Sequence, residues 1–139
     1  MKVYLDANIL YGTFKSFLLS IRDGHEFKES KMLRELSKEH ELYTSYLTLA
    51  EIVENLRKDF PNVEKSTLWF LIKVIMKTYE IRLIGLDNIS KDVLLFAING
   101  SSAKDAVHLA AACKKGLFIA TKDKKLKEVA KEFYARIFE

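Results

Sequence analysis

The sequence predicts an α/β fold, a three-layer α/β/α sandwich in which a mainly parallel sheet of four to five strands lies between two layers of helices. Short strand-like apolar segments alternate along the chain with longer segments whose apolar residues recur at helical spacing. The length of 139 residues suits one compact domain, so we expect residues 1–139 to form a single unit. The composition, 49% hydrophobic and 30% charged with one proline and five glycines, is typical of a folded chain.

The first half of the chain predicts two strands and four helices. The strands are the short apolar segments 3–5 and 41–45. Apolar residues at helical spacing predict helices over residues 9–21, 27–38, 47–60 and 63–80. Gly24 is placed to end the first of these helices and Pro61 to end the third.

The second half continues the alternation. Strands are predicted over residues 81–86 and 117–121, with a final edge strand over 135–138. Helices are predicted over 89–98, 103–116 and 124–133, the second of which ends at Gly116. Strands joined through helices form right-handed crossovers and therefore parallel sheets, which bind ligands beyond the carboxyl ends of their strands.

Composition also bears on the setting of the protein. The single cysteine, Cys113, cannot form an internal disulfide, and no basic-then-apolar leader precedes the first strand, so we expect a reducing, cytoplasmic environment. Cys113 lies on an apolar stripe, which predicts a small buried core residue rather than a nucleophile. The apolar run Leu68 to Ile72 is far too short to cross a bilayer, and we expect no membrane association.

The basic charge is concentrated at one end of the chain. Residues 114–139 hold eight basic and four acidic side chains, so this segment accounts for the whole formal charge of +4. A basic end suits a polyanionic partner such as nucleic acid. The alternative is a solvated helix face that happens to be rich in lysine.

Four acids lie where parallel strands end or the following helices begin: Asp6, Glu51, Asp105 and Asp123. The expected strands before Asp6 and Asp123 end at one edge of the sheet, and the helices that carry Glu51 and Asp105 begin at the same edge. All four side chains could therefore meet in one cleft. Clustered carboxylates repel one another and stay ionised only with cations among them. Oxygen ligands without thiolate or imidazole favour Mg²⁺ or Mn²⁺ over zinc, and such a site suits hydrolysis of a phosphodiester.

Each acid also has a structural interpretation. Asp6 could cap the first long helix, and Asp123 could favour the positive end of the last helix. The pairs Thr48-x-x-Glu51 and Ser102-x-x-Asp105 have the spacing of a capping box. Taken singly, each acid is better explained as a cap; the metal interpretation depends on their convergence.

Four motifs then resemble a known family: "YLDANIL", "TSYLTLAEIVENL", "AKDAVHLAAACKKG" and "LFIATKDKKL". They are similar, in the same order, to the acidic motifs of the PIN-domain ribonucleases, which include the VapC-type toxins. The resemblance implies that the four acids hold Mg²⁺ or Mn²⁺ for endonuclease cleavage of RNA. It also implies that Asn8 and Thr121 orient ligands or water, although both could be turn and strand-end residues.

The resemblance further implies partners. These are an RNA substrate, a second copy of the chain in a homodimer, and a small antitoxin protein with a segment that enters the cleft. Helices near Phe14 to Ile21 or Leu68 to Met76 could supply the contact surface. The chain departs from the family at Lys125 and Leu126, where many members have an acid and a phenylalanine, and this departure puts a second metal site in doubt. Three lysines would instead contact RNA phosphates: Lys122, Lys124 and Lys125.

Other interpretations stay open at this point. An aspartate-nucleophile phosphatase would also place an acid after strand one, but it usually has a second aspartate where this chain has Asn8. A non-catalytic RNA-binding module could keep the fold with a silent site. His108 shares a helix face with Asp105, so it could be a metal ligand or general base, although a hydrogen-bonded wall residue is the expectation.

Overall fold

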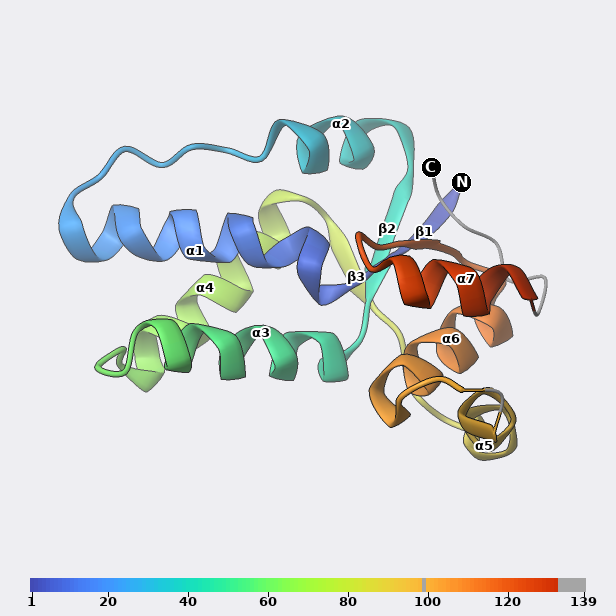
Figure 1. The fold of residues 1–139 in the computed structure, drawn as a ribbon. Coiled ribbons are helices and arrows are strands. Elements are labelled where there is room, and N and C mark those ends of the chain that lie inside the picture. The colour runs from blue at the N-terminus through green and yellow to red at the C-terminus, as the bar shows by residue number, and fades with distance from the viewer. Residues whose placement is uncertain (99, 133–139) are drawn as a thin grey trace.

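The sheet has the predicted parallel arrangement in the computed structural model, which describes residues 1–98 and 100–132 (Figure 1). Its strands are β1 (Lys2–Leu5), β2 (Glu41–Thr44), β3 (Ile81–Leu83) and β4 (Phe118–Ala120). Their spatial order is β3-β2-β1-β4, and every neighbouring pair is parallel. β1 is therefore an inner strand, whereas β3 and β4 are the two edge strands of the described sheet. The edge strand predicted over residues 135–138 lies outside the described residues.

Seven helices connect or follow these strands in the described part of the chain. They are α1 (Ala7–Asp23), α2 (Lys31–Glu39), α3 (Tyr46–Asp59), α4 (Lys65–Thr78), α5 (Ser90–Ile98), α6 (Ala103–Lys115) and α7 (Lys124–Glu132). Gly24 and Gly116 follow α1 and α6 with φ of 69° and 66°, so both glycines end their helices as predicted. α2 begins later than predicted because Ser30 caps it and accepts a hydrogen bond from the Leu33 N–H.

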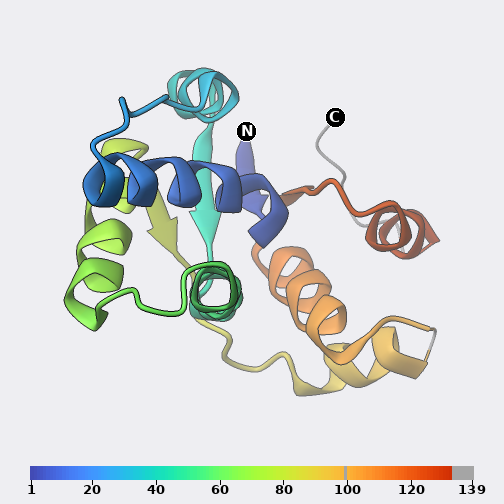
Figure 2. The same cartoon turned by 60° about the vertical axis from the view of Figure 1, so that its left-hand side comes forward.

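Two hydrophobic cores lie on opposite faces of the sheet. Helices α1 to α4 cover one face and α5 to α7 the other (Figure 2). Side chains alternate along β1, so Val3 and Leu5 join the core beneath α1 to α4, while Tyr4 joins the core of α5 to α7. This is the predicted three-layer α/β/α arrangement.

Parallel pairing brings the segments that follow the strands to one edge of the sheet. Leu5 is in register with Ala120, and the Asp6 N–H donates to the Ala120 carbonyl at 3.0 Å. Asp6 and Thr121 are therefore neighbours although they are far apart in the sequence. β2 ends at the same edge, where the chain turns through Ser45 into α3.

Cys113 is exposed, which makes the prediction of a buried core residue wrong: the buried stripe of α6 ends at Ala112, one residue earlier. Within residues 1–98 and 100–132, no helix has the length and apolar character needed to cross a membrane.

Candidate metal centre

All four predicted acids line one pocket at the carboxyl edge of the sheet. The pocket has a volume of about 500 Å³, and its walls include Asp6, Glu51, Asp105 and Asp123. Asn8 and Lys122 also line the pocket, whereas Lys124 and Lys125 are exposed and lie outside its lining. The convergence expected from strand order is therefore present in the structure.

The Asp6 side chain is held by hydrogen bonds to both of its carboxylate oxygens. Oδ1 accepts from the Ala7 N–H at 2.8 Å, so Asp6 caps α1, and Oδ2 accepts from the Thr121 hydroxyl at 2.7 Å. Only 7% of the residue is exposed. The cap and the pocket position are compatible, because a carboxylate oxygen has two lone pairs and can accept more than one bond.

Thr121 and Asn8 connect the ends of β1 and β4. The Thr121 hydroxyl accepts from the Asp123 N–H at 3.1 Å and from the Asn8 side-chain amide at 3.2 Å. The Asn8 side-chain oxygen accepts from the Lys122 N–H at 3.0 Å. Both side chains therefore connect Asp6 and the end of β1 to the loop that carries Asp123.

Glu51 is free of the capping role that its spacing allowed. The helix cap is Ser45, whose hydroxyl accepts from the Thr48 N–H, so α3 begins at Tyr46 and Thr48 lies inside its first turn. The predicted Thr48-x-x-Glu51 capping box is therefore wrong. Glu51 instead reaches the pocket, where its Oε1 lies 2.7 Å from Nε2 of His108.

His108 belongs to the site more closely than the sequence indicated. It is 1% exposed, and its Nε2 lies 3.9 Å from Oδ1 of Asp6 as well as close to Glu51. Its Nδ1 lies 2.5 Å from the hydroxyl of Tyr4. The prediction that His108 is a hydrogen-bonded residue in the wall of the site is thus confirmed. No sequence pattern pointed to Tyr4, whose position in an apolar strand predicts only a core side chain.

Asp105 and Asp123 each combine a helix-end role with a place in the pocket. The Ser102 hydroxyl accepts from the Asp105 N–H at 3.2 Å, as the predicted capping box requires. Asp123 Oδ1 accepts from two N–H groups in the first turn of α7. Burial raises the pKa of Asp105, and the negative charge of Asp123 raises it further.

The acids of the pocket lack a lysine or arginine counterion within residues 1–98 and 100–132. No lysine or arginine of the described residues forms an ion pair with any of the four acids. Carboxylate oxygens of Asp6 and Glu51 and a ring nitrogen of His108 lie within 4.8 Å of one another, close enough to share one ion. Oxygen-rich donors, unneutralised charge and a raised pKa at Asp105 fit a hard divalent cation.

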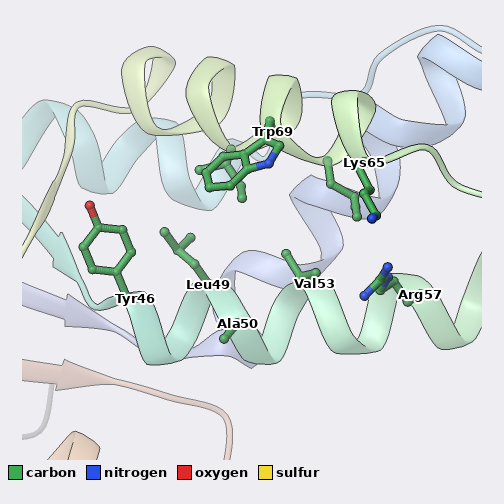
Figure 3. A pocket seen from close by; sticks show the side chains of 9 residues that line it. Tyr46, Leu49, Ala50, Val53, Arg57, Lys65 and Trp69 are labelled. Atoms are coloured by element: carbon green, nitrogen blue, oxygen red, sulfur yellow. The ribbon is translucent and has the colours of Figure 1, made fainter.

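A second, apolar cavity lies between α3 and α4 and is separate from the acids. We call it the α3–α4 groove; its volume is about 350 Å³, and its lining is Tyr46, Leu49, Ala50, Val53, Arg57, Lys65, Leu68, Trp69 and Ile72. Arg57 and Lys65 lie together at one end and Tyr46 at the other, with the Trp69 ring over the middle (Figure 3). Trp69 is 65% exposed and Tyr46 69% exposed, so two aromatic side chains of the groove are accessible to a partner.

Comparison with known proteins gives a family and a fold. A family model described as PIN domain matches residues 3–132, which is nearly the whole chain. None of the curated proteins compared with the chain matches it.

Three solved structures share the fold at low sequence identity. VapBC-1 from nontypeable Haemophilus influenzae has a TM-score of 0.67 and 15% identity, with 100% of this chain and 98% of that chain covered. VapBC2 from Rickettsia felis, bound to a DNA fragment from its promoter, has a TM-score of 0.65, 16% identity and the same coverage. PAE2754 from Pyrobaculum aerophilum has a TM-score of 0.60 and 19% identity, with 93% and 84% covered.

Proposed function

Because the chain belongs to the PIN-domain family, we propose that it is a divalent-metal-dependent ribonuclease and the toxin component of a toxin–antitoxin pair, acting in the cytoplasm. One observation carries the proposal: four carboxylates line a single pocket without a lysine or arginine partner among the described residues. A resident divalent cation explains such a cluster better than four separate helix caps, because Glu51 caps no helix.

The roles follow from the positions of the side chains. Asp6, Glu51, Asp105 and Asp123 would hold Mg²⁺ or Mn²⁺. When bound, the ion would supply a nucleophilic hydroxide at neutral pH and stabilise the charge that develops on the phosphate. Asn8 and Thr121 keep Asp6 and the Asp123 loop in place through the hydrogen bonds described above.

Three lysines are proposed to bind the RNA backbone. Lys122 lines the pocket, and Lys124 and Lys125 are exposed at the start of α7. Contacts of lysine with phosphate position the strand without reading its sequence. Recognition of a particular RNA would then depend on its shape and on unpaired bases.

The activity is tested by cleavage of labelled structured and single-stranded RNAs. The full chain, Asp6→Asn and Asp92→Asn are compared with Mn²⁺ and with EDTA. Asn caps a helix as well as Asp does, so Asp6→Asn should keep the fold while it loses a charged ligand. Asp92 is exposed in the first turn of α5 and provides the matched control.

We expect metal-dependent cutting by the wild type and by Asp92→Asn, and none by Asp6→Asn. RNA binding without cutting by a folded, metal-loaded protein would favour the non-catalytic module instead. Stable modification of Asp6 by beryllium fluoride would favour the aspartate-nucleophile phosphatase, because that reagent mimics a phosphorylated aspartate.

We also propose that the α3–α4 groove receives an amphipathic helix of the antitoxin. The solved structures with this fold include VapBC assemblies, and Leu68, Trp69 and Ile72 of the groove belong to a helix that the sequence indicated as a contact surface. Arg57 and Lys65 at one end favour a partner helix with acidic residues at the matching end.

Trp69 makes this partner site directly measurable, because it is the single tryptophan of the chain. The probe is a synthetic helical peptide with leucines on one face and three glutamates at one end. We expect its binding to shift the Trp69 emission to shorter wavelength and to weaken in Arg57→Glu. Equal binding of a peptide with lysines in place of the glutamates would count against the charge match. We also propose that the chain forms the homodimer that the family resemblance implies, and sedimentation of the full chain tests it.

A further inference from the structure

A chain of hydrogen bonds runs from the helix cap of α3 through the sheet to the candidate metal site. The Tyr4 hydroxyl lies 2.8 Å from Oγ of Ser45, 3.0 Å from Oγ1 of Thr48 and 2.5 Å from Nδ1 of His108. On the other side of its ring, His108 Nε2 lies 2.7 Å from Oε1 of Glu51. Tyr4, Ser45 and Thr48 are fully buried, and His108 is 1% exposed.

The direction of these hydrogen bonds follows from what each group can donate. An ionised carboxylate only accepts, so the short contact with Glu51 requires a hydrogen on Nε2. In a neutral imidazole Nδ1 then accepts, and its partner must donate. Tyr4 can donate, because a phenol hydroxyl carries its proton at neutral pH. Ser45 and Thr48 donate to the Tyr4 oxygen in turn.

We propose that His108 is a positioning residue for Glu51 and not a metal ligand. The Tyr4 hydroxyl gives His108 this role, because it holds the ring in the tautomer with hydrogen on Nε2. With its hydrogen on Nε2, the ring directs a donor at Glu51 and has no lone pair to offer at that nitrogen. The assignment of the tautomer does not depend on the proposed function. Only the statement that Glu51 binds metal rests on the proposed function.

The opposite tautomer would change the chemistry of the site. With the hydrogen on Nδ1, Nε2 would present a lone pair within 4.8 Å of oxygens of Asp6 and Glu51. Two carboxylates and an imidazole form a donor set that suits zinc, whereas carboxylates alone suit Mg²⁺ and Mn²⁺. The buried Tyr4 hydroxyl therefore selects for hard cations from the far side of the histidine ring.

The first test is the tautomer itself, read from the side-chain ¹⁵N shifts of His108 by long-range ¹H–¹⁵N NMR of the metal-free chain. The chain has three histidines, and loss of a signal set in His108→Gln identifies the right one. We expect a protonated Nε2 and an accepting Nδ1, unchanged when Mg²⁺ is added. In Tyr4→Phe the population with hydrogen on Nδ1 should rise. A wild type with hydrogen on Nδ1, or an unchanged tautomer in Tyr4→Phe, would overturn the proposal.

The second test uses two amides that each replace one ring nitrogen. The amide of His108→Gln lies near the place of Nε2 and can still donate to Glu51, while that of His108→Asn lies near Nδ1 and cannot reach it. Calorimetric titration with Mn²⁺ should show a loss of about 10–100-fold in affinity for the Asn variant and near recovery for the Gln variant. Equal losses in both folded variants would contradict a positioning role.

Zinc separates positioning from ligation. If His108 does not bind metal, Tyr4→Phe should bind Zn²⁺ more tightly than the wild type, because the freed ring can then offer Nε2. If Zn²⁺ affinity instead falls in His108→Gln far more than Mn²⁺ affinity, His108 is a ligand and the proposal fails. Should the Asn variant not fold, the tautomer measurement on wild type and Tyr4→Phe still decides. Absence of any RNA cleavage would count against the proposed function alone.

Discussion

The hydroxyl of Thr121 donates to Oδ2 of Asp6 at 2.7 Å across 115 positions of sequence. The bond joins the ends of β1 and β4, and the same hydroxyl accepts from the N–H of Asp123. One small side chain thereby sets the relative position of two of the candidate ligands.

Replacement of Thr121 by valine should destabilise the protein and weaken its metal site together. Valine has the same shape but leaves a buried carboxylate oxygen and the Asp123 N–H without their partner, which costs about 1–3 kcal/mol. Urea unfolding and Mn²⁺ titration measure both effects. Thr121→Ser keeps the hydroxyl and is the matched control. If valine and serine behave alike, the hydrogen bonds do not hold the site.

Asp105→Asn should stabilise the metal-free protein at neutral pH. Burial and then the charge of Asp123 raise the pKa of Asp105 above its usual 3.8, so its ionisation opposes folding as the pH rises through the folded-state pKa. In EDTA the variant should therefore unfold at a higher temperature than the wild type at pH 7, with the difference vanishing below about pH 4.

The sign of this effect should reverse when metal is present. In saturating Mn²⁺ the wild type gains the binding free energy of a complete ligand set, and Asp105→Asn gains less. The test is the melting temperature of each of the two proteins, measured once in EDTA and once in Mn²⁺. A variant that is more stable than the wild type under both conditions would argue that Asp105 takes no part in metal binding.

Replacement of Lys122, Lys124 and Lys125 by glutamine should weaken RNA binding without altering its sequence preference. Each phosphate contact with single-stranded RNA contributes about 0.7 to the slope of log affinity against log salt, so the slope should fall by about 2. Fluorescence anisotropy over a range of salt concentrations measures it. A control with three exposed lysines of α2 and α4 exchanged, Lys31, Lys38 and Lys73, should keep the wild-type slope.

Two neighbouring residues of α4 should respond very differently to truncation. Trp69 is 65% exposed, so Trp69→Ala should change the free energy of unfolding by no more than about 0.5 kcal/mol. Leu71 is fully buried, and Leu71→Ala should cost about 2–5 kcal/mol. Urea unfolding followed by circular dichroism compares them. A large loss for Trp69→Ala would mean that the tryptophan serves the fold instead of a partner.

The order of strands and helices was predictable because each element of this chain carries its own periodic pattern and end signal. Gly24, Pro61 and Gly116 mark helix ends by backbone geometry alone, and a glycine or proline acts in the same way whatever surrounds it. The meeting of the four acids was predictable from the direction of parallel strands. Helix starts were less so, because Ser30 and Ser45 compete with other polar residues nearby for the capping position.

The hydrogen bonds of His108 with Tyr4 and Glu51 could not be predicted from sequence patterns. In the sequence, Tyr4 is one apolar residue among several in a strand. Its hydroxyl contacts His108 only because the sheet and α6 bring together positions 104 residues apart. The spacing of His108 from Asp105 predicts a shared helix face, but Nε2 of His108 pairs with Glu51 on another helix. Cys113 lies at the edge of the buried stripe of α6, where a small rotation of the helix decides exposure.

The alternation of side chains along β1 has a consequence for how the chain can change in length. One residue inserted into residues 2–5 would turn Tyr4 toward the wrong core and move Asp6 out of line with Thr121. The mostly exposed connection between Gly24 and Ser30 has no such alternation of buried faces. Growth or shrinkage of the chain is therefore tolerable in that connection, while the opening strand must keep its length for the pocket to exist.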